Sequence, residues 1–325
     1  MFILLILYIA GGLISQFGWS SIGAFLFGSS GYKEIHNLVK EGDIAGVKSY
    51  LEKGGDPNVE GFDGITPLYL AIDAGNFPIV QILVEYEVDV NKKLDDSHFL
   101  DFTPVIQAAY KGHYDIVEFL LTNGAEKDIY ISAILGEVEA IQRYVEAGRD
   151  VNARRSKGTG KPRLGGKTLL HLASWRDSLA AVEFLLEHGA EIDARDDEGY
   201  VPLHSAATCN NKNVVQLLIK QGANVNAKNR MREAPLHFAA RSGNVEIIEI
   251  LLANDADIEA QDGFGGDTPL HCAIRGNSIE VVKVLIAHGA RLCVQGHMGR
   301  TPLGLVKHLG KREQIFQLLI DHGAR

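Results

Sequence analysis

A phrase of four residues recurs through the second half of the chain at an almost constant period. The phrase starts at 168, 201, 234, 268 and 301, so successive starts lie 33, 33, 34 and 33 residues apart. It reads Thr168-Leu-Leu-His171, Val201-Pro-Leu-His204, Ala234-Pro-Leu-His237, Thr268-Pro-Leu-His271 and Thr301-Pro-Leu-Gly304. A constant period of this length is typical of stacked-repeat proteins, and it constrains the fold before any local pattern is considered.

Each repeat predicts a pair of helices. Thr is a preferred helix N-cap that accepts a backbone N–H, and Pro suits the first helical position. Leu203, Leu236 and Leu270 are expected to point into a common core. The first helix is expected to end at a residue suited to left-handed backbone, such as Gly243, before a second helix with paired apolar residues.

The Thr-Pro-Leu-His phrase, the Leu-Leu-x-x-Gly-Ala ending and the following Asp-Val-Asn or Asn-Val-Asn resemble the ankyrin repeat. The resemblance covers residues 33–325. It implies an all-α solenoid of helix–turn–helix units with short β-hairpin or loop fingers. Nine repeats are predicted, with starts near 33, 66, 103, 127, 168, 201, 234, 268 and 301.

The four histidines of the phrase could suggest a metal site. They occupy the same position in successive repeats, and such layers lie about 10 Å apart. Zinc ligands must instead converge to within about 2 Å of the ion. The ankyrin resemblance implies that His171, His204, His237 and His271 support the turn by hydrogen bonding.

The fourth repeat is irregular. Its predicted start near Lys127 follows Thr103 by only 24 residues, and the next start, Thr168, follows 41 residues later. Because the two spacings together approach two periods, one loop is expected to be almost deleted and the next one enlarged.

The first 32 residues form a separate segment with no charged side chain. They are long and apolar enough for a membrane-spanning helix of about 20 residues, here predicted as an anchor within residues 1–28. Lys33 and later lysines follow this segment and no basic residue precedes it, which predicts that the repeats lie in the cytoplasm.

Two alternatives to a membrane anchor stay open for the first 32 residues. One is a cleaved signal peptide on a secreted or periplasmic protein, although a basic start and an Ala-x-Ala-like site are missing. The other is a leader with neither role.

Composition excludes several classes of function. The net charge of −9 and a pI near 5.7 argue against general nucleic-acid binding. Cys209, Cys272 and Cys293 show no metal-binding spacing. Gly165-Gly166-Lys167-Thr168 resembles the end of a nucleotide-binding loop, but Lys161 stands where that loop needs glycine. We therefore expect no catalytic residue, metal, cofactor or small-molecule substrate.

The candidate partner-binding residues follow from the resemblance. In ankyrin proteins the hairpin tips and the exposed end of each first helix usually face partners, and aromatic residues, Met and Arg are enriched at interfaces. The tips hold Phe62, Phe99, Phe102, Tyr200, Arg230, Met231, Phe264, His297 and Met298, and the helix ends hold Tyr110, Trp175, Arg176, Arg241, Arg275 and His308.

Residues 154–167 form a basic insertion without an acidic side chain. Its glycines predict a mobile finger that projects from the stack. A solvated insertion and an anion-binding arm both remain open, and an acidic protein is the favoured partner of such an arm. Its basic residues are Arg154, Arg155, Lys157, Lys161, Arg163 and Lys167.

Together these patterns predict a non-enzymatic interaction scaffold or adaptor, anchored to a membrane. It would bind a macromolecular partner, another protein, on its concave face and fingers. The alternatives are an effector or enzyme with a site in the irregular region 124–168, an exported repeat protein, and a purely structural spacer.

Overall fold

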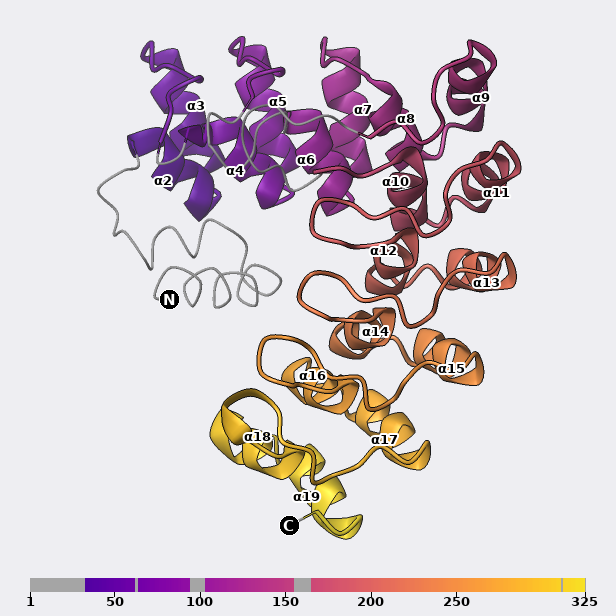
Figure 1. Ribbon diagram of the computed structural model, residues 1–325. Helices are drawn as coiled ribbons and strands as arrows, with labels where there is room; N and C mark the ends of the chain where they lie inside the picture. The colour runs from indigo at the N-terminus through magenta and orange to yellow at the C-terminus, as the bar shows by residue number, and fades with distance from the viewer. Residues whose placement is uncertain (1–32, 62–63, 94–102, 155–164, 311, 325) are drawn as a thin grey trace. The chain divides into compact units, whose positions relative to one another are not determined.

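The computed structural model describes residues 33–61, 64–93, 103–154, 165–310 and 312–324 (Figure 1). These ranges contain paired helices and no strand, and one isolated antiparallel bridge joins Arg154 to Thr168. The fingers there are loops, where β-hairpins or loops were expected. The predicted N-terminal helix lies outside the described residues, and within them no helix is long and apolar enough to cross a membrane.

Nine first helices alternate with nine second helices in the described ranges. The first helices are α2 (Glu34–Glu41), α4 (Pro67–Asp73), α6 (Pro104–Lys111), α8 (Ile129–Leu135), α10 (Leu169–Trp175), α12 (Pro202–Thr208), α14 (Pro235–Ser242), α16 (Pro269–Arg275) and α18 (Pro302–Leu309). The second helices are α3 (Ile44–Glu52), α5 (Phe77–Glu85), α7 (Tyr114–Thr122), α9 (Val138–Glu146), α11 (Leu179–Glu187), α13 (Lys212–Lys220), α15 (Val245–Ala253), α17 (Ile279–Ala287) and α19 (Glu313–Asp321).

The chain divides into two compact units, with the boundary inside α8 between Ile131 and Ser132. In the first unit, α2, α4 and α6 pack on one another in sequence, as do α3, α5 and α7. His36 links its first two repeats, because its Nε2 lies 2.9 Å from the carbonyl oxygen of Ile65.

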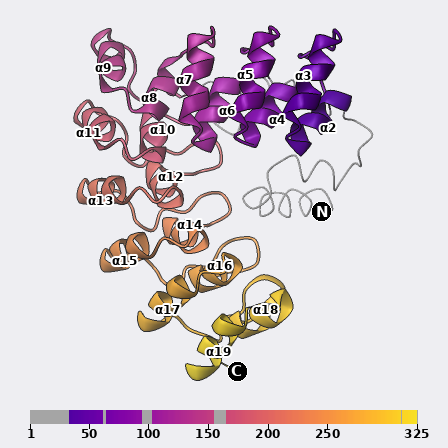
Figure 2. The same ribbon diagram turned by 180° about the vertical axis from the view of Figure 1, so that it is seen from behind.

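The second unit contains α9 to α19. Its first helices α10, α12, α14 and α16 follow one another in one row, and the second helices α11, α13, α15 and α17 form a parallel row (Figures 1 and 2). Leu203, Leu236 and Leu270 lie between the rows with at most 1% of their surface exposed. Burial of such apolar side chains is the main source of stability. Each repeat of a solenoid contacts only its neighbours, so this core is built between adjoining repeats.

The irregular repeat has its helices but lacks a finger. The chain passes from Thr122 at the end of α7 to Ile129 at the start of α8 without a hairpin-length loop. Asp128 caps α8 by accepting the backbone N–H of Ile131 at 2.8 Å. The first helix therefore forms although the segment that usually precedes it is missing.

Candidate functional site

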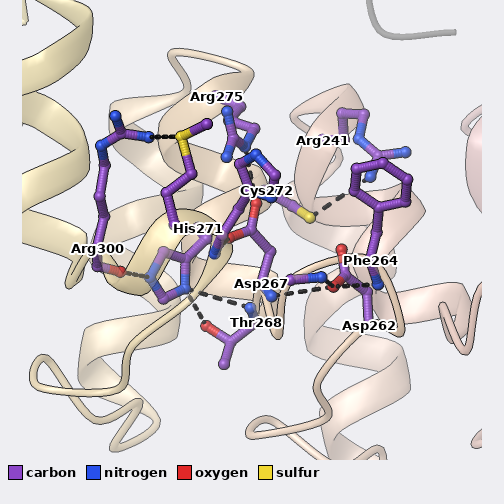
Figure 3. Close-up of polar contacts among 12 residues, drawn as sticks. Arg241, Asp262, Phe264, Asp267, Thr268, His271, Cys272, Arg275 and Arg300 are labelled. Carbon is purple, nitrogen blue, oxygen red and sulfur yellow. Dashed lines mark hydrogen bonds and ion pairs between the residues drawn. The ribbon is translucent and has the colours of Figure 1, made fainter. Parts of the chain in front are cut away.

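A buried histidine at the same position in four repeats of the second unit joins each repeat to the next. Nδ1 of His171 accepts the N–H of Thr168 at 3.2 Å, so Nε2 carries the ring proton and donates to the carbonyl oxygen of Tyr200 at 3.0 Å. The same two contacts occur in the following repeats, where the carbonyl acceptors for His204, His237 and His271 belong to Glu233, Asp267 and Arg300 (Figure 3 shows His271). The histidine therefore supports its own turn and also binds the neighbouring repeat.

The threonines act differently from the simple N-cap expected. The hydroxyl groups of Thr168 and Thr268 lie 2.9 Å from the histidine Nδ1, and neither accepts a backbone N–H of its helix. Thr301, whose repeat has Gly304 in place of histidine, accepts the N–H of Gly304 at 3.2 Å. The hydroxyl of Thr301 therefore caps its own helix.

Two ion pairs fix arginines on the inner face, which we define as the surface made by the first helices and fingers of the second unit. Arg241 Nη2 lies 2.6 Å from Glu233 Oε1. Arg275 Nε lies 2.8 Å from Asp267 Oδ2, and both of these residues are labelled in Figure 3. The carboxylate side chains are 9% and 2% exposed, whereas the arginine side chains are 36% and 29% exposed. The carboxylates are therefore buried, whereas the arginine side chains that they orient stay partly exposed.

Asp267 stays ionised in this arrangement. Burial alone would raise the pKa of its carboxyl group, but the N–H of His297, at 2.7 Å, and the Arg275 guanidinium outweigh burial and lower that pKa. The charge that holds Arg275 is thus maintained.

Lys167 is not part of an exposed basic finger, and its prediction as a finger residue was wrong. Its side chain is 11% exposed and its ammonium lies 2.5 Å from Oδ2 of Asp196, a carboxylate that is 4% exposed. The ammonium also lies 5.9 Å from the centre of the Trp175 ring and 5.4 Å from that of Tyr200. These contacts hold the downstream end of the insertion against the next finger.

Replacing Lys167 with Ser is expected to destabilise the protein by about 1–3 kcal/mol, because Asp196 would lose its cation inside the fold. The loss should not be larger, since Oδ1 of Asp196 also accepts backbone N–H groups from Glu198 and Tyr200. Urea unfolding measures the change. Arg154→Ser, at an exposed residue of the same insertion, should stay within about 0.5 kcal/mol of the wild type. Equal stabilities for the two variants would contradict this role of Lys167.

Half-buried aromatic side chains form a row on the inner face. Beyond Lys167, the centres of the Tyr200 and Phe238 rings lie 5.5 Å apart in an edge-to-face arrangement. The guanidinium carbon of Arg241 lies 5.4 Å from the centre of the Phe238 ring. Trp175, Tyr200 and Arg241, predicted separately, are therefore connected through Lys167 and Phe238. Such rings combine an apolar surface with fixed geometry, which suits recognition.

Backbone hydrogen bonds join the fingers in succession. Asp197 donates its N–H to the carbonyl of Gly165 at 2.8 Å, Arg230 to Glu198 at 2.9 Å, and Gly263 to Met231 at 2.7 Å. Each bond lies about one repeat beyond the previous one. The finger tips are thus held in register before any partner binds.

The finger tips present several of the predicted residues. Met231 is 46% exposed and Met298 is 70% exposed, and Arg230 is exposed beside Met231. The rings of Phe264 and His297 stack with centres 5.7 Å apart. The second unit therefore brings these tip residues onto one series of connected loops.

The other predicted residues are not gathered there. Arg176 is half-buried just after α10, and burial lowers the pKa of its guanidinium; His308 is exposed in α18. Tyr110 lies in α6, but its side chain is outside the described part. Also outside the described residues are Phe62, Phe99, Phe102, Arg155, Lys157, Lys161 and Arg163.

The sequence interpretation missed residues that organise this face: Asp196, Glu233, Asp267 and Phe238. A signal existed for two of them. A carboxylate directly before the helix cap, with Arg eight residues later, occurs as Glu233 with Arg241 and again as Asp267 with Arg275. Asp196 gave no comparable signal, because its partner Lys167 lies in the preceding repeat.

In the described ranges, no group of three or more His, Cys, Asp or Glu side chains could hold a metal ion. Cys272 is 1% exposed, and burial raises the pKa of its thiol to about 12, so the thiol stays protonated. The lysine of the Gly-Gly-Lys-Thr segment is bound to Asp196, and Thr168 contacts His171.

Comparison with known proteins agrees with this architecture. A family model described as ankyrin repeats matches residues 35–131, 129–229, 170–262 and 236–325. The chain is 41% identical to ankyrin repeat and SAM domain-containing protein 6 of Rattus norvegicus over 97 residues, which are 29% of this chain and 10% of that protein. It is 31% identical to the B-cell lymphoma 3 protein of Homo sapiens over 155 residues, 46% of this chain and 34% of that protein.

A third relative is the transient receptor potential cation channel subfamily A member 1 of Homo sapiens. The identity is 27% over 173 residues, which are 50% of this chain and 15% of the channel subunit. The chain thus spans only a part of each of these relatives. The family model matches nearly all of residues 35–325, and the helix pairs and histidine contacts repeat with the same period. The chain therefore belongs to the ankyrin-repeat family.

Proposed function

We propose that the protein is a non-catalytic scaffold or adaptor that binds another protein through the inner face of its second unit. Ankyrin repeats generally bind proteins and do not catalyse reactions. The observation that carries the proposal is the continuous surface from Trp175 through Phe238 to the finger tips. It combines half-buried rings, oriented arginines and exposed methionines, the side chains that contribute most at interfaces.

Crosslinking followed by affinity capture of the full-length chain tests the proposal. Replacing Met231 and Met298 with Ser is expected to reduce the crosslinked partner without changing the melting temperature, because both side chains are exposed. Leu179→Ser is the matched control, since Leu179 is 36% exposed on α11, a helix of the other row. Equal loss in both variants, or capture of no specific partner by the wild type, would contradict this function.

The basic insertion is a second element of the proposed interaction. We infer that Arg154, Arg155, Lys157, Lys161 and Arg163 serve as an arm for an acidic partner surface. Exposure of Arg154 and the absence of acidic residues from 154–167 support this role. Lys167 is excluded from the arm, because its charge is bound to Asp196.

Membrane attachment through residues 1–28, with the repeats in the cytoplasm, is also a proposal. Its support is the sequence of 32 residues without charge, followed by lysines. Full-length protein is expected to sediment with membranes and to resist carbonate extraction, whereas a variant lacking residues 1–32 should stay in the supernatant. A mature N-terminus found between residues 12 and 32 would instead establish a cleaved signal peptide.

A further inference from the structure

One finger of the second unit carries arginine where its neighbours carry glycine. Gly199, Gly266 and Gly299 follow the tips of three fingers with φ of 79°, 80° and 69°, and Arg232 takes the same place with φ of 59°. Left-handed backbone is unfavourable for a residue with a side chain and costs glycine little. Folding alone would therefore favour glycine at 232, which points to another reason for the arginine.

The Arg232 side chain is positioned as well as exposed. A Cβ atom added to Gly263 of the next finger would lie 3.2 Å from Cδ of Arg232, so the arginine stem runs over the Gly263 backbone. The same finger is held by the hydrogen bond from Gly263 to Met231. Packing of the stem leaves the guanidinium group at the surface, where Arg232 is exposed.

The surface around Arg232 is basic although the whole chain has a net charge of −9. Arg230 and Arg232 are exposed, and neither makes an ion pair within the described part of the chain. Two fingers further on, the guanidinium of half-exposed Arg300 lies 3.0 Å from the sulfur of Met298. The basic surface ends on the other side at exposed Glu198.

The carboxylates near Arg230 and Arg232 do not neutralise the positive charge of this surface. Glu233 and Asp267 are buried and bound to arginines. Asp262 is 7% exposed, and its Oδ1 accepts the backbone N–H groups of four successive residues, 264–267. The charges that face solvent here are therefore mainly positive.

Apolar side chains alternate with these cations. Met231 stands between Arg230 and Arg232, and Met298, also left-handed with φ of 60°, is 70% exposed. Phe264 lies on the intervening finger. A ligand with only negative charge would leave the methionines without a contact.

We propose that this finger strip, defined as Arg230, Met231, Arg232, Phe264, Met298 and Arg300, binds an acidic segment of the partner protein that carries apolar side chains between its carboxylates. The proposal rests on the scaffold function above and adds the chemistry of the partner. Guanidinium groups bind carboxylates through paired hydrogen bonds, and methionine adapts to varied apolar side chains. A nucleic acid fits less well, because its uniform charge would also meet Glu198 and the acidic remainder of the chain.

The left-handed position provides a test that separates binding from folding. The probe is a short fluorescent peptide that alternates glutamate and leucine, titrated into the full-length protein. Arg232→Gly should keep or raise the melting temperature, because glycine relaxes the backbone, and should weaken binding about threefold. Adding Arg230→Ser and Arg300→Ser should bring the loss to about tenfold at low salt and reduce it at high salt.

A control variant and two control ligands complete the test. Lys220→Ser removes an exposed cation from α13, in the other row, and should leave the affinity unchanged. A peptide with glutamine in place of glutamate should bind much more weakly, and oligothymidylate should bind more weakly than the acidic peptide. Equal binding by the Arg232→Gly variant, equal binding of the glutamine peptide, tighter binding of the oligonucleotide, or no binding of the acidic peptide would each overturn it.

The scaffold function can fail or stand separately. If Arg232→Gly leaves the crosslinked partner unchanged while the Met231 and Met298 variant loses it, the acidic-segment proposal is overturned and the scaffold function stands. If the wild type captures no specific partner, the scaffold function itself fails.

Discussion

Lowering the pH from 7 towards 4 is expected to destabilise the protein by several kcal/mol, because buried neutral histidines cannot take up protons. Burial lowers the pKa of His171 from 6.5 to about 3 and that of His204 to about 4. Each unit of lowering corresponds to about 1.4 kcal/mol between the two protonation states. Burial also lowers the pKa of His36, His237 and His271.

The direction follows from linkage between protonation and folding. Above pH 6.5 these histidines are neutral in both the folded and the unfolded chain, so their titration does not reduce the free energy of unfolding. Between pH 6.5 and about 4 the unfolded chain binds protons that the folded chain excludes, and the free energy of unfolding falls. Below the folded pKa values no further loss arises from these groups.

Urea unfolding at a series of pH values measures this effect. His204→Asn should be less stable than the wild type at pH 7, since the contact with Glu233 is disturbed, but should lose less stability on acidification. The smaller loss of stability in this variant would distinguish protonation of His204 from protonation of the other acid-titrating groups of the protein. A wild-type free energy of unfolding that stays constant from pH 7 to pH 5 would contradict the prediction.

Leu236→Ala is expected to lower the free energy of unfolding by about 2–5 kcal/mol, as large-to-small changes in a packed core do. Leu236 is 1% exposed in α14, which packs on both α12 and α16. Because repeats contact mainly their neighbours, hydrogen exchange should rise most in these adjoining helices. Leu179→Ala is the matched control, because Leu179 is 36% exposed, and it should have a far smaller effect. A melting temperature within a degree or two of the wild type for Leu236→Ala would contradict the assigned register.

The sequence predicted the helical architecture well because the signals that start and end each helix lie within the same repeat. The period, the Pro at the first helical position and the glycine after Ser242 act locally, so their outcome in α14 and its siblings follows from spacing alone. The shortened loop before α8 was predicted in the same way, since its missing residues show in the count between Thr103 and Lys127.

The parts that the sequence did not predict depend on side-chain pairs that join a finger to a neighbouring finger or helix. Lys167 stands in a basic, glycine-rich segment, and only the fold shows that Asp196, 29 residues later, removes it from solvent. Arg241 was predicted as a helix-end residue, but the contact that orients it, with Glu233, crosses the turn between finger and helix. Periodic patterns identify positions in a repeat, whereas such pairings depend on which side chains two positions happen to carry.

The histidine contacts have a consequence for synthesis on the ribosome. The carbonyl that receives the Nε2–H of His171 belongs to Tyr200, and that for His237 belongs to Asp267, so each acceptor is translated about one repeat after its donor. A nascent chain that stops between the two retains a ring donor without its acceptor, at a cost of about 1–3 kcal/mol if the ring is buried. The newest repeat on an elongating or truncated chain is therefore held less firmly than those already followed by another, and quality-control proteases should find it first.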